Sequence, residues 1–330
     1  MRKIEGCFWK RIHLILVIVS AVLLMSAGTA IAKTVYVDQS NSSGTEDGTT
    51  PETAFLTIQE GVNAANQLDT VKVAPGLYNE DVSIDGVAIK LISADPSTTT
   101  VQGGGDVLNI FGAFSPASGF GDVEVAGFTI TGGNNSGILL NSDTVKGIIH
   151  NNIILGNKYG IRAQNGADAT IYNNTVLNNS SIGISANGAE VSASNNIIVD
   201  NEGCGLDAHR ATINSAYDNL LSNTAGDYCP DSYNYGYINK TNDTSAPPLF
   251  LSGNGFHLSS VSPCIDAGSP ATAHNDPDGT RNDQGVFGGP GSANFWPQPA
   301  GAPVVTHLSV TPSSVAEGGT LTLKATGKIP

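Results

Sequence analysis

Three residues in the middle of the chain have side chains suited to acid–base chemistry on a sugar: Arg162, Asp207 and His209. An arginine can neutralise a uronate carboxylate, a histidine can act as a base near neutral pH, and an aspartate can hold a cation. This combination suits β-elimination from an acidic polysaccharide. The alternative is that all three are solvated residues on the outside of a strand.

These residues belong to two columns of a repeated segment that begins with a glycine. Two positions after the successive glycines, the chain has Leu139, Arg162, Ser185 and Asp207. Four positions after them, it has Asn141, Gln164, Asn187 and His209, and Arg210 follows His209 directly. Alternating residues of a strand point to opposite faces, so both columns lie on one outward face. An elongated polymer on this face would meet a set of binding residues: Asn141, Gln164, Ser185, Asn187 and Arg210.

Hydrolysis of a glycosidic bond requires two carboxyl groups about 5 to 9.5 Å apart. The two columns contain only one, that of Asp207. Asp168 and Glu190 align one repeat apart, but at strand starts on another part of the chain. The sequence therefore favours elimination over hydrolysis.

A second polar cluster lies in the segment NDPDGTRND, which contains Asn275, Asp276, Asp278 and Asp283. Clustered carboxylates on a glycine-containing loop suit Ca²⁺, which takes six to eight oxygen ligands. The spacing does not match an EF-hand. The alternative is a polar turn in which Arg281 pairs with an aspartate, and a bound Ca²⁺ would have a structural role.

The elements that must position these residues repeat every 22 or 23 residues. One column contains Gly137, Gly160, Gly183 and Gly205, and another contains Asn152, Asn174, Asn196 and Asn219. A helix-pair repeat would need about 33 residues and would avoid this density of Asn, Gly and β-branched residues, so the period indicates a coil of short parallel strands. The glycines are expected to let each turn reverse tightly. A ladder of side-chain amides is predicted for Asn134, Asn157, Asn179 and Asn201.

The N-terminal part of the coil contains one predicted helix, in TIQEGVNAAN at residues 57–66. Thr57 and Glu60 have the spacing of a capping box, and Ile58 and Val62 share one face. We expect this helix to cap the open end of the coil.

The repeats resemble the secreted right-handed parallel β-helix proteins with a pectate-lyase-like fold, over most of residues 33–290. The opening "KTVYVDQSNSSGTEDG" is similar to the N-terminal cap of pectinesterase-like and lyase-like members. The later "SPCIDAG" and "DPDGTRND" are similar to the closing segment of bacterial surface β-helix proteins. The resemblance implies an all-β right-handed parallel β-helix. The pectinesterase motifs of paired Asp, Arg and Gln are not found, so no catalytic residue is transferred.

Residues 1–32 have the composition of a secretory signal peptide cleaved near Ala32. Four basic residues precede an apolar run from Leu14 to Met25 that is shorter than the roughly 20 residues of a membrane span. The mature chain is thus predicted to be secreted or at the cell surface, without a membrane span.

The net charge of the predicted mature chain limits the classes of partner that it can bind. Four of the 15 basic residues and one of the 29 acidic residues lie in the predicted signal peptide. The mature chain therefore has 11 basic and 28 acidic residues, which gives a formal net charge of −17. Such a surface repels nucleic acid and anionic lipid, which leaves a polysaccharide or a cell-surface glycan as the expected partner. We expect a monomer.

Three cysteines follow the signal peptide, and secretion makes one disulfide feasible. We predict a Cys229–Cys264 pair, because both residues lie outside the regular repeats, and a packed Cys204. Three unpaired thiols are the alternative.

The predicted organisation is a β-helix over 33–243, its closing segment over 244–297, and a linker with the first strands of an incomplete immunoglobulin-like domain over 298–330. The expected function is binding or processing of polysaccharide outside the cell. The competing hypothesis is a non-catalytic structural or adhesion module of a larger surface protein.

Overall fold

The structure, a computed structural model, describes residues 32–112, 122–231, 235–253 and 255–296, and the backbone of 304–311 and 322–328. The predicted signal peptide, except its last residue, and most of the predicted linker lie outside these residues. Within the described ranges, no helix is long and apolar enough to cross a membrane.

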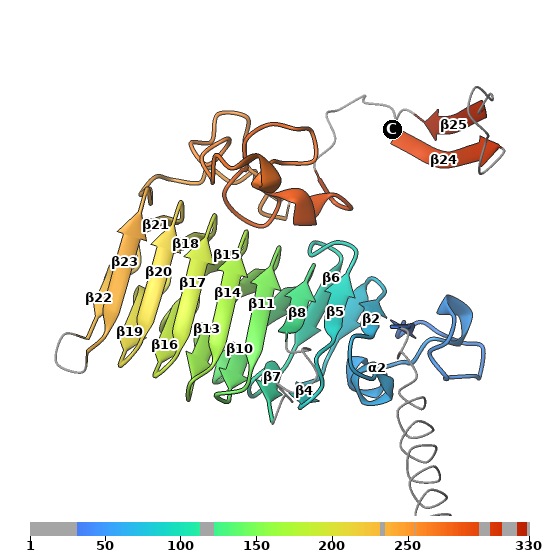
Figure 1. Ribbon diagram of the computed structural model, residues 1–330, viewed down its shortest axis with the longest axis horizontal. Helices are drawn as coiled ribbons and strands as arrows, with labels where there is room; N and C mark the ends of the chain where they lie inside the picture. The colour runs from blue at the N-terminus through green and yellow to red at the C-terminus, as the bar shows by residue number, and fades with distance from the viewer. Residues whose placement is uncertain are drawn as a thin grey trace, which may run out of the picture. The chain divides into compact units, whose positions relative to one another are not determined.

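Three parallel sheets form the right-handed β-helix that the sequence predicts (Figure 1). The first sheet contains, in order, β1 (Thr34–Val37), β2 (Thr70–Val73), β5 (Lys90–Ser93), β8 (Asp122–Ala126), β11 (Lys146–His150), β14 (Asp168–Tyr172), β17 (Glu190–Ser194), β20 (Thr212–Ala216) and β23 (Tyr237–Thr241). The second contains β22 (Gly226–Pro230), β19 (Cys204–His209), β16 (Ile184–Asn187), β13 (Tyr159–Gln164), β10 (Ser136–Asn141), β7 (Leu108–Phe111) and β4 (Val82–Asp85). The third contains β21 (Asn219–Leu221), β18 (Ile197–Val199), β15 (Thr175–Leu177), β12 (Ile153–Leu155), β9 (Thr129–Thr131), β6 (Thr99–Gln102) and β3 (Gly76–Tyr78).

Each turn of the coil contributes one strand to each sheet, and the strands stack in register. In the second sheet Ile161 pairs with Ile184, which pairs with Leu206. All three are fully buried in the central core. The predicted alternation of inward and outward side chains is confirmed, since Ala163 is buried while Arg162 remains partly exposed.

Two ladders of buried amides run up the coil. In one, Asn157 donates to Asn179, which donates to Asn201, and Asn201 donates to Asn223 at 2.8 to 3.2 Å. The predicted member Asn134 is not in this ladder, because Gly133 occupies that position and donates its N–H to Asn157 instead. Asn134 is exposed.

The second ladder joins Asn152, Asn174 and Asn196 and ends on Asp218. Asn219, which the sequence places in one column with these asparagines, is out of register by one residue: its partner in the neighbouring strand is Ile197, so the residue opposite Asn196 is Asp218.

The glycine column has a different role from the one predicted. Gly160 is outside the left-handed region, and a Cβ atom there would lie 2.5 Å from the oxygen of Gly183 and 3.0 Å from Asn179 Nδ2. Gly137, Gly183 and Gly205 are equally enclosed. The glycines therefore make room for the amide ladder and the neighbouring turn.

The two asparagines of each adjacent pair have different structural roles. The second member of each pair points into the ladder, while the first, at Asn151, Asn173 and Asn195, has a φ of 50° to 57°. These first members bind the closing segment: Asn151 donates to the oxygen of Val286, and Asn195 accepts from the N–H of Ser269. A second apolar core fills the contact, with Ile153, Leu177, Ile197, Val199, Cys264, Val286 and Phe287.

Helix α2 (Ile58–Ala64) begins with the predicted capping box between Thr57 and Glu60. Ile58 and Val62 are buried in the central core. Its role as a cap over the open end stays a prediction. At the other end of the chain, β24 (Val304–Thr311) and β25 (Thr322–Lys328) pair antiparallel.

The predicted disulfide is wrong. Cys204 pairs with Cys229, with 6.1 Å between their Cα atoms, while Cys264 is unpaired and buried in the second core. The regular repeat includes the segment of Cys229, which the sequence analysis placed outside it, so Cys229 lies on β22, next to the strand of Cys204.

Candidate functional site

The outward face of β13, β16, β19 and β22 carries a groove of about 510 Å³. Arg162, Asp207 and His209 all line it. The other residues of its lining are Tyr159, Ile182, Ser185, Asn187, Cys229, Pro230 and Asp231. The structure thus brings the three predicted catalytic residues, and two of the predicted binding residues, to one surface.

The register fixes the spacing along the groove. Arg162 pairs with Ser185, which pairs with Asp207. Since neighbouring strands are about 4.8 Å apart, the backbones at Arg162 and Asp207 are about 10 Å apart. The groove therefore has a cationic end on β13 and an acidic end on β19 and β22.

The acidic end contains a histidine–carboxylate pair. His209 Nδ1 lies 2.6 Å from Asp231 Oδ2, and both side chains are partly exposed. A carboxylate only accepts hydrogen bonds, so in the neutral ring Nδ1 carries the proton and Nε2 is left as an acceptor. The pair therefore has the form of an oriented base.

Sequence reasoning missed Asp231. Its main chain is held in place by a hydrogen bond from its own N–H to the oxygen of Ala208 at 2.9 Å. The repeat period does indicate this residue, because adding one period of 22 residues to His209 gives Asp231. The Tyr- and Asn-rich composition after residue 227 hid this last turn.

Asp207 has a different environment from Asp231. Burial raises its pKa, and the negative charge of Asp231 acts in the same direction. A hydrogen bond from Ser185 Oγ at 3.3 Å and the nearby His209 oppose that shift. The net effect favours the protonated carboxylic acid relative to an exposed aspartate, which suits a proton donor.

Aromatic and cationic groups gather at the opposite end. The Arg162 guanidinium lies 5.0 Å from the ring centre of Tyr159, and Lys158 Nζ lies 5.5 Å from it. Contact with the ring orients Arg162 while leaving it charged. This end can therefore attract an anionic group.

The remaining predicted binding residues lie elsewhere. Asn141 and Gln164 belong to the column of Asn187 and His209, but they are not part of the groove lining. Arg210 is exposed just beyond the end of β19 and is also outside it. Ser185, expected to face solvent, is only 4% exposed, because it lies between its neighbours and contacts Asp207.

The predicted calcium ligands are occupied by internal hydrogen bonds. Asp276 accepts from the N–H groups of Asp283 and Gly289, and Asp278 accepts from Thr280. Asn275 donates to the oxygen of Gly279. Among the described residues, no group of three or more His, Cys, Asp or Glu side chains is arranged to hold a metal.

The predicted turn arginine has partners other than an aspartate. Arg281 donates to the backbone oxygens of Gly268 and Ala267. Burial raises the pKa of Asp276 to about 7 and that of Asp283 to about 6.

Comparison with known proteins supports the architecture. Residues 98–244 match the family described as a right handed beta helix region. No curated protein matches the chain. The fold and groove define a right-handed parallel β-helix protein with acid–base residues on its outer face.

Solved structures that resemble the chain include a mutant pectin methylesterase in complex with a hexasaccharide, with 8% identity, a TM-score of 0.36, and coverage of 71% of this chain and 95% of that one. The pectate lyase Pel9A has 11% identity, a TM-score of 0.35, and coverage of 79% and 97%. ORF18 of Geobacillus virus E2 has 14% identity, a TM-score of 0.31, and coverage of 64% and 60%. No residue role is taken from these structures.

Proposed function

We propose that the groove binds an acidic polysaccharide and that Asp207, His209 and Asp231 hydrolyse it. The observation that carries this proposal is the 2.6 Å contact between His209 and Asp231 in the same groove as Asp207. Hydrolysis needs a proton donor and a base on either side of the bond, and the groove supplies both.

The two carboxylates lie near each other in the groove. Asp231 follows the register partner of Asp207 by two residues, in the neighbouring strand. Combining one strand spacing with two residues of rise gives backbone positions about 8 Å apart.

The roles follow from the environments. Asp207 gives its proton to the glycosidic oxygen as the bond from the anomeric carbon to that oxygen breaks. Water attacks the anomeric carbon and loses a proton to His209 Nε2, while Asp231 holds Nδ1–H and stabilises the positive ring. Proton return through solvent restores both groups.

Arg162 gives a reason to expect an acidic substrate. About 10 Å separates its backbone from that of Asp207, so the cationic end would bind a carboxylate on a neighbouring sugar unit. The chain has a formal net charge of −14, which repels an acidic polymer, and Arg162 offsets that repulsion locally.

The same arginine favours elimination as a second candidate. In that reaction His209 would take the proton next to a uronate carboxylate, the bond to the leaving sugar oxygen would break, a carbon–carbon double bond would form, and Asp207 would protonate the oxygen. Arg162 would have to neutralise the carboxylate of the reacting sugar itself. Its position two strands away is the reason for placing hydrolysis first.

Product analysis separates these reactions. A panel of acidic and neutral polysaccharides is incubated with the chain, and the products are examined for new reducing ends and for the ultraviolet absorbance of an unsaturated uronate. Hydrolysis predicts shorter saturated chains, and elimination predicts unsaturated ones. Unchanged chains across the panel would overturn the proposal in favour of a structural or adhesion module.

A further inference from the structure

Asp231 directly follows β22, a strand at the edge of its sheet. β22 pairs with β19 on one side and ends the strand order on the other. All five of its residues are partly or fully exposed. Pro230 lacks an N–H donor, which this edge position tolerates, because the bond to β19 at this point is donated by the N–H of Asp231 to the oxygen of Ala208.

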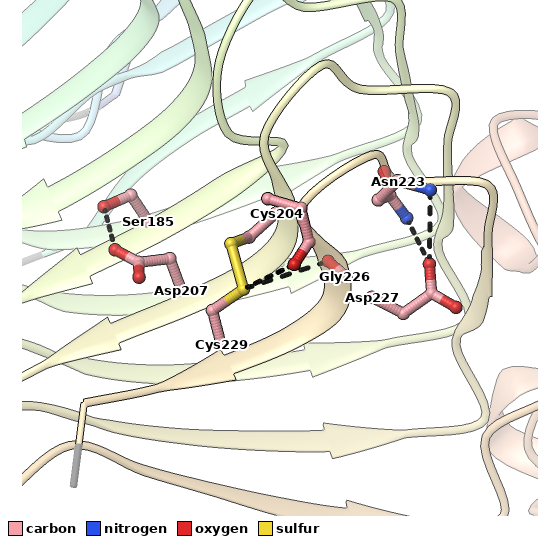
Figure 2. Close-up of a disulfide and its surroundings, with 8 residues drawn as sticks. Ser185, Cys204, Asp207, Asn223, Gly226, Asp227 and Cys229 are labelled. Atoms are coloured by element: carbon pink, nitrogen blue, oxygen red, sulfur yellow. Dashed lines mark hydrogen bonds between the residues drawn. A yellow bond between two sulfur atoms is a disulfide. The ribbon is translucent and has the colours of Figure 1, made fainter.

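The Cys204–Cys229 disulfide joins this edge strand to β19 (Figure 2). Cys229 is the register partner of Asp207 and lies two residues before Asp231. It also lines the groove. The disulfide is therefore next to both carboxylates, and Figure 2 shows it beside the contact between Asp207 and Ser185.

We propose that this disulfide is a positioning device that holds Asp231 against His209, so that the base of the groove is complete only in the oxidised protein. The inference rests on the proposed function for its catalytic consequence, but the geometric claim stands on the position of Cys229. Cys204 lies on β19 together with His209, and Cys229 lies on β22, which Asp231 directly follows.

The redox step is an ordinary thiol–disulfide exchange. A dithiol reductant attacks one sulfur of the bridge through a mixed disulfide, closes to its own cyclic disulfide, and leaves Cys204 and Cys229 as thiols, a transfer of two electrons and two protons. Cys229 is only partly buried and faces the groove, so such a reagent can reach it. Without the bridge, β22 is held by its backbone pairing and its remaining side-chain contacts.

The test compares the oxidised full chain, the same chain treated with dithiothreitol, and the variant Cys204→Ser/Cys229→Ser. The first readout is the NMR signal of the hydrogen-bonded Nδ1–H of His209, assigned through its loss in His209→Gln. The second is kcat and KM on a polysaccharide that the oxidised chain cleaves. Cys264→Ser is the matched control, because this thiol is buried in the second core, away from the groove.

The proposal expects reduction, or the double serine variant, to remove the Nδ1–H signal and to lower kcat on the order of 10- to 100-fold with little change in KM. Asp231→Ala removes the acceptor and should produce the same loss, and reduction should then add nothing. Far-ultraviolet circular dichroism checks that the coil remains folded. If the double variant does not fold, Cys229→Ser and the dithiol-treated native chain provide the same comparison.

An unchanged Nδ1–H signal in a folded, reduced chain would overturn the positioning role. A redox-sensitive signal in a chain that cleaves none of the polysaccharides would leave the positioning role standing and would contradict the proposed function. The two failures are thus distinguished.

Discussion

Asn196 donates a hydrogen bond from Nδ2 to Asp218 Oδ1 at 2.9 Å, so a ladder of buried asparagines passes onto a buried carboxyl group. Ser215 Oγ lies 2.8 Å from Asp218 and 2.6 Å from Asp243. Its hydroxyl has only one proton to donate. Both contacts can be hydrogen bonds only if one of the two carboxyl groups also carries a proton. Asp218 is the group that can carry it, because burial raises its pKa to about 7.

Asp218→Asn should therefore stabilise the protein at neutral and higher pH. The unfolded carboxyl releases its proton near pH 3.8 and the folded one near pH 7, so the unfolded state binds fewer protons between these values. The free energy of unfolding consequently falls as pH rises through this window.

An asparagine at this position donates to Ser215 at every pH. We expect the variant to gain on the order of 2 to 4 kcal/mol at pH 8, and little at pH 4, in urea unfolding. Asp168→Asn, at an exposed site on β14, is the control. Equal pH profiles for Asp218→Asn and the unsubstituted chain would contradict this account.

Asn179→Ala should destabilise the coil by about 2 to 4 kcal/mol. Asn179 accepts from the N–H and the amide of Asn157, and it donates to Asn201 and to the oxygen of Ile154. Alanine leaves these buried groups without their partners. Asn134→Ala, at an exposed position outside the ladder, should change the unfolding midpoint little. Similar midpoints for both variants would show that the ladder does not stabilise the fold.

Gly160→Ala tests the close approach around the glycine column. The new Cβ would lie 2.5 Å from the oxygen of Gly183, which is backbone and can move only with its strand. We expect a loss of about 1 to 3 kcal/mol, measured by thermal or urea unfolding. Gly104→Ala is the control, because a Cβ there meets no atom within 4 Å. An undiminished stability of Gly160→Ala would refute the close packing.

Arg162→Ala should weaken binding of an acidic polysaccharide roughly tenfold or more, because a charge-assisted hydrogen bond is lost. The effect should fall mainly on KM, since Arg162 lies two strands from Asp207. Arg210→Ala removes the same charge outside the groove and should bind normally. If kcat fell and KM stayed constant, Arg162 would act at the reacting sugar, which would favour elimination.

The period in the sequence predicted most of the coil. The glycine column and Asn152, Asn174 and Asn196 kept their register, because a parallel stack with a buried face allows no slip of one residue. Asn219 failed because the ladder keeps its step of 22 residues and reaches Asp218, where a buried Asp replaces Asn at the end of the ladder. Local sequence does not show which of two adjacent polar residues points inward.

The candidate site was only partly predictable. Arg162, Asp207 and His209 were found from the alternation after each glycine, but Asp231 and the Cys204–Cys229 bridge depend on a last turn with an irregular composition. The pairing of cysteines is set by the strand order, which spacing does not reveal. Extending the period of 22 residues past Asp207 and His209 gives both Cys229 and Asp231.

The most direct test of the central claim is the rate at which Asp207→Asn cleaves a polysaccharide that the unsubstituted chain shortens, with Asp168→Asn as the control on a different sheet. The account predicts that Asp207→Asn binds the polymer normally and loses on the order of 10²- to 10⁴-fold in kcat, while Asp168→Asn keeps its activity. Equal rates for Asp207→Asn and the unsubstituted chain would contradict the claim that this groove is the catalytic site.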